Sequence, residues 1–193
     1  MSGQVGGTWR AQAYLRKALV AKATGVTRKD AVAAVVSELE RLEAVELAER
    51  DEEGVPSTET YREALAGILP TLPPGHKAML AAHLRAPDHL ITATLLAKAA
   101  GYSGYEGANL QYGKLGQRVA EAVGFAPPTR ENGTTIWTCG IARDPSAEIE
   151  YPDTSMLESL ERSVGAAHFE WQLRPQVVQA LRSLGFDGAS TGR

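Results

Sequence analysis

The segment that most constrains the fold of this chain is residues 90–124, LITATLLAKAAGYSGYEGANLQYGKLGQRVAEAVG. It predicts a short helix, a turn and a longer helix. Thr92 or Thr94 can cap the first helix, because a hydroxyl oxygen at that position accepts a hydrogen bond from a free backbone N–H. Gly101 and Gly104 mark the turn, since glycine readily adopts the backbone conformations that end helices. This is the spacing of a helix-turn-helix.

The second predicted helix, Tyr105 to Val123, has one apolar face and one polar face. At about 100° per residue, apolar residues at i, i+4, i+7, i+11 and i+14 form a stripe that must face a core. These residues are Ala108, Tyr112, Leu115, Val119 and Ala122. Leu110 is expected to be exposed on the opposite, otherwise polar face.

The same helix contains Gly107, Gly113 and Gly116. Each glycine costs about 1 kcal/mol relative to alanine in a helix interior. Three of them indicate that another group comes close to the helix backbone. That group is either a ligand or, in an ordinary helical hairpin, a tightly packed neighbouring helix. The sequence leaves both interpretations open.

In a DNA-binding helix-turn-helix, the second helix enters the major groove. Asn or Gln bonds adenine bidentately, Lys reaches guanine or phosphate, and an apolar side chain touches the thymine methyl group. The helix residues that fit these roles are Tyr105, Asn109, Leu110, Gln111 and Lys114, with Arg118 as a phosphate contact. They are the predicted DNA-binding residues.

The charge of the chain weakens this hypothesis without excluding it. The 193-residue chain has a net charge of −3 and a pI near 5.8, which argues against a strongly basic nucleic-acid coat. Residues 10–29 nevertheless carry only basic charges, whereas residues 38–53 are dominated by carboxylates. A single cysteine, Cys139, excludes an internal disulfide. No signal peptide or membrane-spanning apolar run is visible, so a cytoplasmic protein is expected.

The N-terminal part, residues 1–55, is predicted to be a helical hairpin. Its first helix would run from Thr8 to Ala23, and Thr27 with Asp30 would open the second as a capping box. The polar segment Arg50 to Ser57, with its glycine and proline, is the best candidate linker. Because such a hairpin buries little by itself, it should dock on the rest of the chain or pair with a second copy.

Residues 58–186 are predicted to form a winged-helix domain, in which three helices are followed by a small sheet. The predicted helices are Thr58–Leu69, His76–Arg85, Thr92–Ala100, Tyr105–Val123, one around Ser155–Val164 and one opening at Pro175; the strands are Thr134–Ile141 and His168–Leu173. The fold class is therefore mainly α with a small antiparallel sheet. Arg130, beside an Asn-Gly turn, is the predicted wing contact, or else a solvated turn residue. Residues 187–193 are expected to be a disordered tail.

No catalytic or metal-binding pattern is found in the sequence. His76 and His83 are seven residues apart, which is not the i, i+4 spacing of a helical zinc site, and His89 follows in a loop. Cys139 has the surroundings of a small buried apolar residue. No phosphate-binding glycine loop is present. We therefore expect no enzymatic activity, no metal and no cofactor.

Four segments resemble a winged-helix family of bacterial proteins, found alone or as N-terminal modules of HNH-type modification-dependent restriction nucleases. They are MLAAHLRAP, the spacing of LITATLLAKAAGY, ANLQYGKLG and EWQLRPQVVQALRSLGF, and the resemblance covers about residues 72–186. It implies binding of double-stranded DNA, with sensitivity to base modification in a restriction or defence setting. Tyr105, Asn109, Gln111, Tyr112 and Lys114 belong to the shared motif.

A modified-base pocket, if the resemblance holds, needs aromatic walls, and Tyr102, Tyr105, Trp137 and Trp171 are the candidates. Core or edge packing is the ordinary alternative for each. The chain lacks the HNH pattern, so cleavage would require a nuclease partner. The competing hypothesis is a protein-interaction or scaffold module that binds a protein through the acidic N-terminal helix and the exposed Leu110.

Overall fold

The computed structural model describes residues 2–15, 18–145 and 170–187. The chain divides into two compact units, Met1–Gly54 and Val55–Arg193. The boundary falls within the segment Arg50 to Ser57 that was expected to be a linker.

The first unit is a three-stranded antiparallel sheet with one helix packed on it. The strands are β1 (Ser2–Val5), β2 (Thr8–Leu15) and β3 (Ala18–Gly25), in the order β1-β2-β3, and the helix is α1 (Arg28–Ala48). The predicted capping box is confirmed, because Thr27 accepts from the Asp30 backbone N–H while the Asp30 side chain accepts from that of Thr27.

The predicted helix from Thr8 to Ala23, and with it the helical hairpin of residues 1–55, is wrong. This segment forms β2 and most of β3. Ala11 and Ala21 are buried in the core shared with α1, whereas Arg10 and Lys22 are exposed. That alternation has a period of two, the period of a strand. Alanines satisfy both a helical and a strand pattern, so the apolar spacing misled the prediction.

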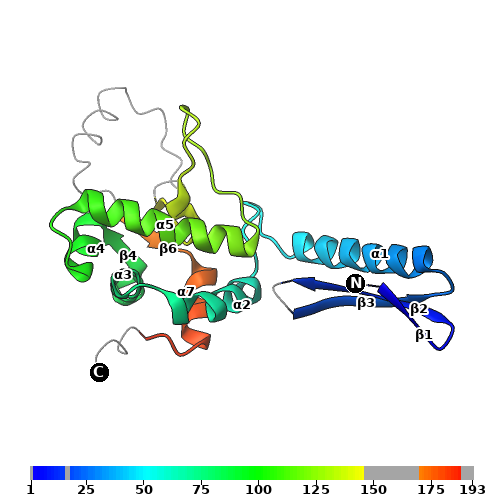
Figure 1. The fold of residues 1–193 in the computed structure, drawn as a ribbon. Helices are drawn as coiled ribbons and strands as arrows, with labels where there is room; N and C mark the ends of the chain where they lie inside the picture. Colours follow the sequence, from blue (N-terminus) through cyan, green and yellow to red (C-terminus); the bar gives the residue numbers. More distant parts are fainter. Residues whose placement is uncertain (1, 16–17, 146–169, 188–193) are drawn as a thin grey trace. The chain divides into compact units, whose positions relative to one another are not determined.

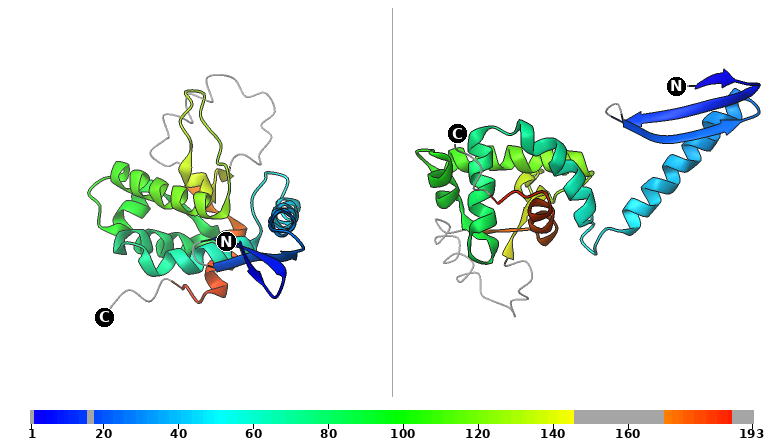
Figure 2. Two further views of the ribbon diagram at one scale, coloured as in Figure 1. Left: turned by 45° about the vertical axis from the view of Figure 1, so that its right-hand side comes forward. Right: turned by 90° about the horizontal axis from the view of Figure 1, so that it is seen from below.

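The core of the first unit is small. Its buried side chains are Ala11, Ala21, Ala31 and Val35. Figure 2 shows the C-terminal half of α1 running away from the sheet, and residues 40–49 are all exposed. The helix is therefore held to the sheet mainly by its N-terminal half.

The second unit contains five described α-helices. They are α2 (Thr58–Ile68), α3 (Pro74–Arg85), α4 (Ala93–Ala100), α5 (Tyr105–Val123) and α7 (Pro175–Ser183). Short 3₁₀ helices lie at η1 (Leu69–Thr71), η2 (Pro87–His89) and η3 (Trp137–Gly140). All the helices predicted within the described residues of this unit are confirmed, and Thr92 caps α4 as expected.

A three-stranded antiparallel sheet completes the second unit. Its strands are β4 (Leu90–Thr92), β5 (Ala142–Arg143) and β6 (Glu170–Leu173), in the order β4-β6-β5. The sheet thus joins a strand from between α3 and α4 to two strands that follow α5. β6 confirms the described part of the predicted strand His168–Leu173. The predicted helix around Ser155–Val164 and nearly all of the predicted tail lie outside the described residues.

The predicted strand Thr134–Ile141 is wrong. Thr135 makes an isolated bridge to Thr129, and the chain then enters η3. In Figure 1 the segment between α5 and η3 extends away from the helices as a narrow loop. Its β-branched residues suggested a strand, but the backbone of η3 packs directly on α5 instead of joining the sheet.

The described helices of the second unit surround one core, which is built by α2, α3, α4, α5, α7 and the sheet β4-β6-β5. Along α5 the predicted stripe faces this core: Ala108, Tyr112, Leu115 and Val119 are buried, and Ala122 is half-buried. Among the described helices, none combines the length and the hydropathy that crossing a bilayer would need.

Candidate functional site

An open groove of about 1040 Å³ lies along the polar face of α5. One wall is α5 itself, and the N-terminal end of α4 contributes to it. The other wall is formed by the loop before η3, by η3 and by the start of β6. The residues that line the groove include Thr94, Tyr105, Asn109, Leu110, Lys114, Gln117, Arg130, Trp137, Asp144 and Trp171.

The α5 wall presents the side chains that the helical pattern placed there. Asn109 and Lys114 are exposed, and so are the apolar side chains of Tyr105 (53 %) and Leu110 (59 %). Leu110 and Lys114 lie on the face opposite the buried stripe, Asn109 lies on its flank, and Tyr105 lies in the first turn of the helix. The groove is therefore lined on this side by an amide, an ammonium group and two apolar surfaces.

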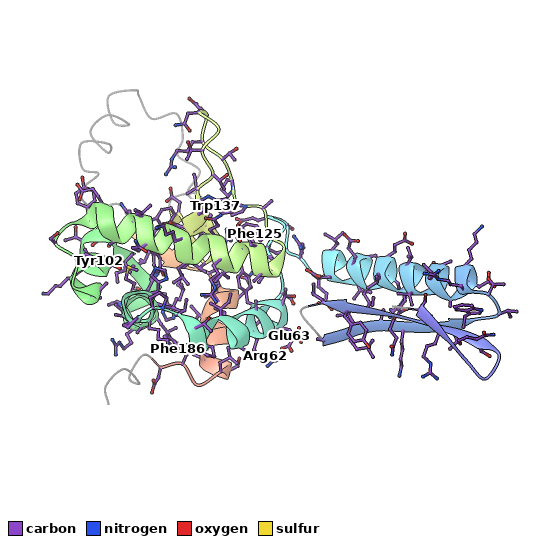
Figure 3. All side chains as sticks on the ribbon, in the orientation of Figure 1. Arg62, Glu63, Tyr102, Phe125, Trp137 and Phe186 are labelled. Carbon is purple, nitrogen blue, oxygen red and sulfur yellow. The ribbon has the colours of Figure 1, made fainter. Side chains whose placement is uncertain are left out.

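The opposite wall brings in residues far away in the sequence. Arg130 is exposed in the loop between α5 and η3, and Trp137 lies beside α5 at the base of that loop (Figure 3). Trp171 reaches the groove from β6. Arg130 was predicted to contact DNA from a wing of the sheet. It precedes β5 in the chain, so it lies outside the segment that connects the strands β5 and β6.

The distance between the two walls depends on a backbone contact between α5 and η3. A Cβ atom on Gly116 would overlap the carbonyl oxygen of Trp137, and one on Gly140 would overlap the carbonyl oxygen of Gly116. Tyr61 Oη also donates to Gly140 O at 3.0 Å, and buried Arg174 donates from Nε to Cys139 O at 2.9 Å. The close approach predicted for the helix glycines occurs at Gly116, and the approaching group is the chain itself.

Buried His83 connects α5 to the sheet beneath the groove. The ring lies between Tyr112 Oη (2.5 Å from Nδ1) and the backbone oxygen of Trp171 (2.9 Å from Nε2). Burial lowers the pKa of His83 to about 4, so the ring is neutral at pH 7. In a neutral ring, Nε2–H donates to Trp171 and Nδ1 accepts from Tyr112. Burial also raises the pKa of Tyr112, which keeps its hydroxyl protonated as a donor.

Three of the predicted site residues lie outside the groove. Gln111 is half-buried and accepts from His76 Nε2 at 3.2 Å, and Arg118 donates to Thr71 Oγ1 at 2.6 Å. Tyr102 lies at the turn between α4 and α5, away from Trp137, and its hydroxyl is close to Gly75 (Figure 3). The structure therefore groups Tyr105, Asn109, Leu110, Lys114, Arg130, Trp137 and Trp171, and leaves these three apart.

The prediction missed several lining residues. Gln117 follows Lys114 by three residues on the polar face of α5, so helical spacing alone could have identified it. Thr94, Ile136 and Asp144 come from other elements, and no local pattern in the sequence places them beside α5. Two cations, Lys114 and Arg130, and one carboxylate, Asp144, line the groove, which gives it a slight excess of positive charge.

The described residues contain no group of three or more His, Cys, Asp or Glu side chains arranged to hold a metal ion. The contacts available in the groove are hydrogen bonds, cationic contacts and stacking surfaces. When the chain is compared with protein-family models, curated proteins and solved structures, nothing matches.

Proposed function

We propose that the second unit is a winged-helix domain that binds double-stranded DNA in the groove along α5 and has no catalytic activity of its own. The observation that carries this proposal is the exposed pair Asn109 and Lys114 facing a groove whose other wall holds Arg130. The element order supports it as well, since α3, β4, α4 and α5 are followed by β5 and β6 in a sheet ordered β4-β6-β5.

The side chains of the groove suit the chemistry of a DNA major groove. The Asn109 amide can bond adenine bidentately, and Leu110 can contact a thymine methyl group. Lys114 and Arg130 can neutralise phosphates on the two sides of the inserted helix. Thr94 at the start of α4 adds a hydroxyl that can donate to a phosphate oxygen.

The first test is the affinity for duplex DNA and its dependence on salt. We expect Lys114→Ala and Arg130→Ala each to weaken binding roughly three- to tenfold for every sequence and to reduce the salt slope by about 1, because each removes one phosphate contact. Arg118→Ala is the matched control, since that cation lies on the same helix but outside the groove. If no duplex binds in a mobility-shift titration at low salt, the proposal is wrong.

Specificity is tested at Asn109, the residue placed to contact a base edge. Asn109→Ala should relax the sequence preference by about 1–3 kcal/mol at one base pair and leave non-specific binding nearly unchanged. Binding selections on methylated and unmethylated duplex pools would measure this. They also test whether Trp137 and Trp171 give a preference for a modified base. Equal selectivity of Asn109→Ala and wild type would exclude a base contact by this residue.

We further propose that the first unit pairs with a second copy. A 54-residue unit rarely has a sufficient core by itself, and this one buries only alanines and one valine while α1 exposes apolar side chains. The exposed residues are Val32, Val36, Leu42, Val45 and Leu47. A nuclease partner, expected from the resemblance, stays a separate hypothesis.

Light scattering after size exclusion should give twice the 20.6 kDa chain mass for the wild type. Leu42→Lys together with Val45→Lys should shift the protein to monomers, because two charges would enter the apolar contact. Leu110→Lys, an exposed leucine in the other unit, should leave the dimer intact. A monomeric wild type would contradict the pairing, and a stable protein complex without DNA binding would favour the interaction-module alternative.

A further inference from the structure

The first unit has a sheet face that α1 does not cover. In β2, Arg10, Gln12 and Tyr14 alternate with residues that pack toward α1, so their side chains point to the opposite face. The register pairs Arg10 with Thr24 and Gln12 with Lys22 across β2 and β3. Because directly paired residues lie on the same face, these five side chains share one surface with Leu19, which pairs with Tyr14 after a register irregularity. We call this surface the outer sheet face.

The outer sheet face has no acidic residue. Residues 1–29 contain no Asp or Glu, and the first carboxylate of the chain, Asp30, is used in the capping box of α1. Arg10 and Lys22 are exposed, and neither takes part in an ion pair among the residues that the structure describes. In an acidic protein this face is therefore a locally basic surface whose charges are not neutralised by neighbours.

We propose that the outer sheet face is a second contact surface for duplex DNA, with Arg10 and Lys22 contacting phosphates and Tyr14 contacting a base edge or a sugar. The choice of partner rests on the proposed function of the groove. A sheet can make such a contact, because the major groove is about 12 Å wide and admits a two-stranded ribbon, and the side chains of this face all come from the two paired strands β2 and β3. β-strands are a known means of reading DNA grooves.

The mixture of groups on this face favours nucleic acid over an acidic protein surface. The Tyr14 hydroxyl donates to Gln12 Oε1 at 3.1 Å, which orients the amide along the strand beside the two cations. Amide, phenol, hydroxyl and cationic groups match alternating phosphate and base-edge acceptors, and the exposed Leu19 beside Tyr14 can contact a sugar or a thymine methyl group. The apolar side chains exposed on α1 lie on another element, so pairing of two copies through α1 leaves this face open.

Two DNA-contacting surfaces on one chain reinforce each other. Once the groove along α5 holds a duplex, the second contact becomes intramolecular and gains from the resulting effective concentration. The full chain should therefore bind longer duplexes more tightly than the groove contact alone allows. The outer sheet face then contributes to affinity and salt dependence more than to sequence preference.

The test compares double variants of the full chain that remove the same charge. Arg10→Gln with Lys22→Gln should weaken binding to a 40-base-pair duplex about tenfold and lower the salt slope by about 2. Lys29→Gln with Arg41→Gln, both on α1, is the matched control and should change affinity less than twofold. Circular dichroism, the melting temperature and light scattering check that each variant keeps its fold and oligomeric state.

Arg10→Glu provides a second variant, which should weaken binding more than Arg10→Gln because it adds repulsion from phosphate. If the sheet and control variants bind DNA like the wild type, the inference is wrong. The inference is also wrong if Arg10→Gln with Lys22→Gln changes only the oligomeric state, because the outer sheet face would then bind a second copy of the chain and not DNA. Lys114→Ala separates the two proposals: loss of binding in the sheet variants but not in Lys114→Ala would refute the groove and retain the sheet.

Discussion

Gly116→Ala is expected to lower the free energy of unfolding of the second unit by about 1–3 kcal/mol. Alanine favours a helix by about 1 kcal/mol over glycine, so propensity alone predicts the opposite sign. The new Cβ atom, however, would overlap the backbone oxygen of Trp137, and backbone cannot move aside as a flexible side chain can. The η3 segment must shift, and one wall of the groove shifts with it.

Gly113→Ala, three residues earlier on α5, is the matched control. The closest atom to a Cβ at this position is Thr138 Oγ1 at 4.0 Å, which is an ordinary contact. We expect this variant to be as stable as the wild type or up to about 1 kcal/mol more stable. Urea unfolding of both variants measures the difference. Equal stability of the two would show that the packing of η3 on α5 does not constrain Gly116.

The second large effect is a loss of stability between pH 7.5 and pH 5 caused by His83. The folded state keeps this ring neutral, with a pKa of about 4, whereas the unfolded chain takes up a proton near pH 6.5. The unfolded state thus binds more protons in this range, and stability falls as the pH falls. This difference in the pKa of His83 lowers the free energy of unfolding by about 2 kcal/mol at pH 5, and the decrease levels off below pH 4.

Urea unfolding at a series of pH values measures this effect. Fluorescence in a Trp9→Phe background would report on Trp137 and Trp171 in the second unit. The double variant His83→Leu with Tyr112→Phe removes the titrating ring and its donor together, and it should abolish this part of the decline. His76→Gln retains His83 and should show the same decline as the wild type. A decline that persists in the double variant would assign the pH dependence to other groups.

The helices of the second unit were predictable because their signals are local. The bounds of α5 follow from Gly104, Gly124 and an apolar stripe with helical period, and the structure has the helix at Tyr105–Val123. The same locality explains the errors. Thr8 to Ala23 is rich in alanine and can satisfy two periods, and the contacts that select strands involve α1, whose sequence comes later.

The candidate site divides in the same way. The polar face of α5, with Asn109, Leu110 and Lys114, was predictable from spacing, and so was its exposure. The hydrogen bonds of Gln111 with His76 and of Arg118 with Thr71 could not be predicted in this way, because those partners are 35 and 47 residues away in the sequence. A helical wheel gives the direction of a side chain but not the neighbour that it meets.

The sequence by itself determined the described helices of the second unit, the caps Thr27 and Thr92 and the polar face of α5, since these depend on residues within a few turns of one another. Tertiary structure alone decided which loop forms the second wall of the groove, how closely η3 packs on Gly116, and that His83 is buried as a neutral ring. The physical reason is that burial and close contact are properties of the packed chain, in which segments distant in sequence exclude water together.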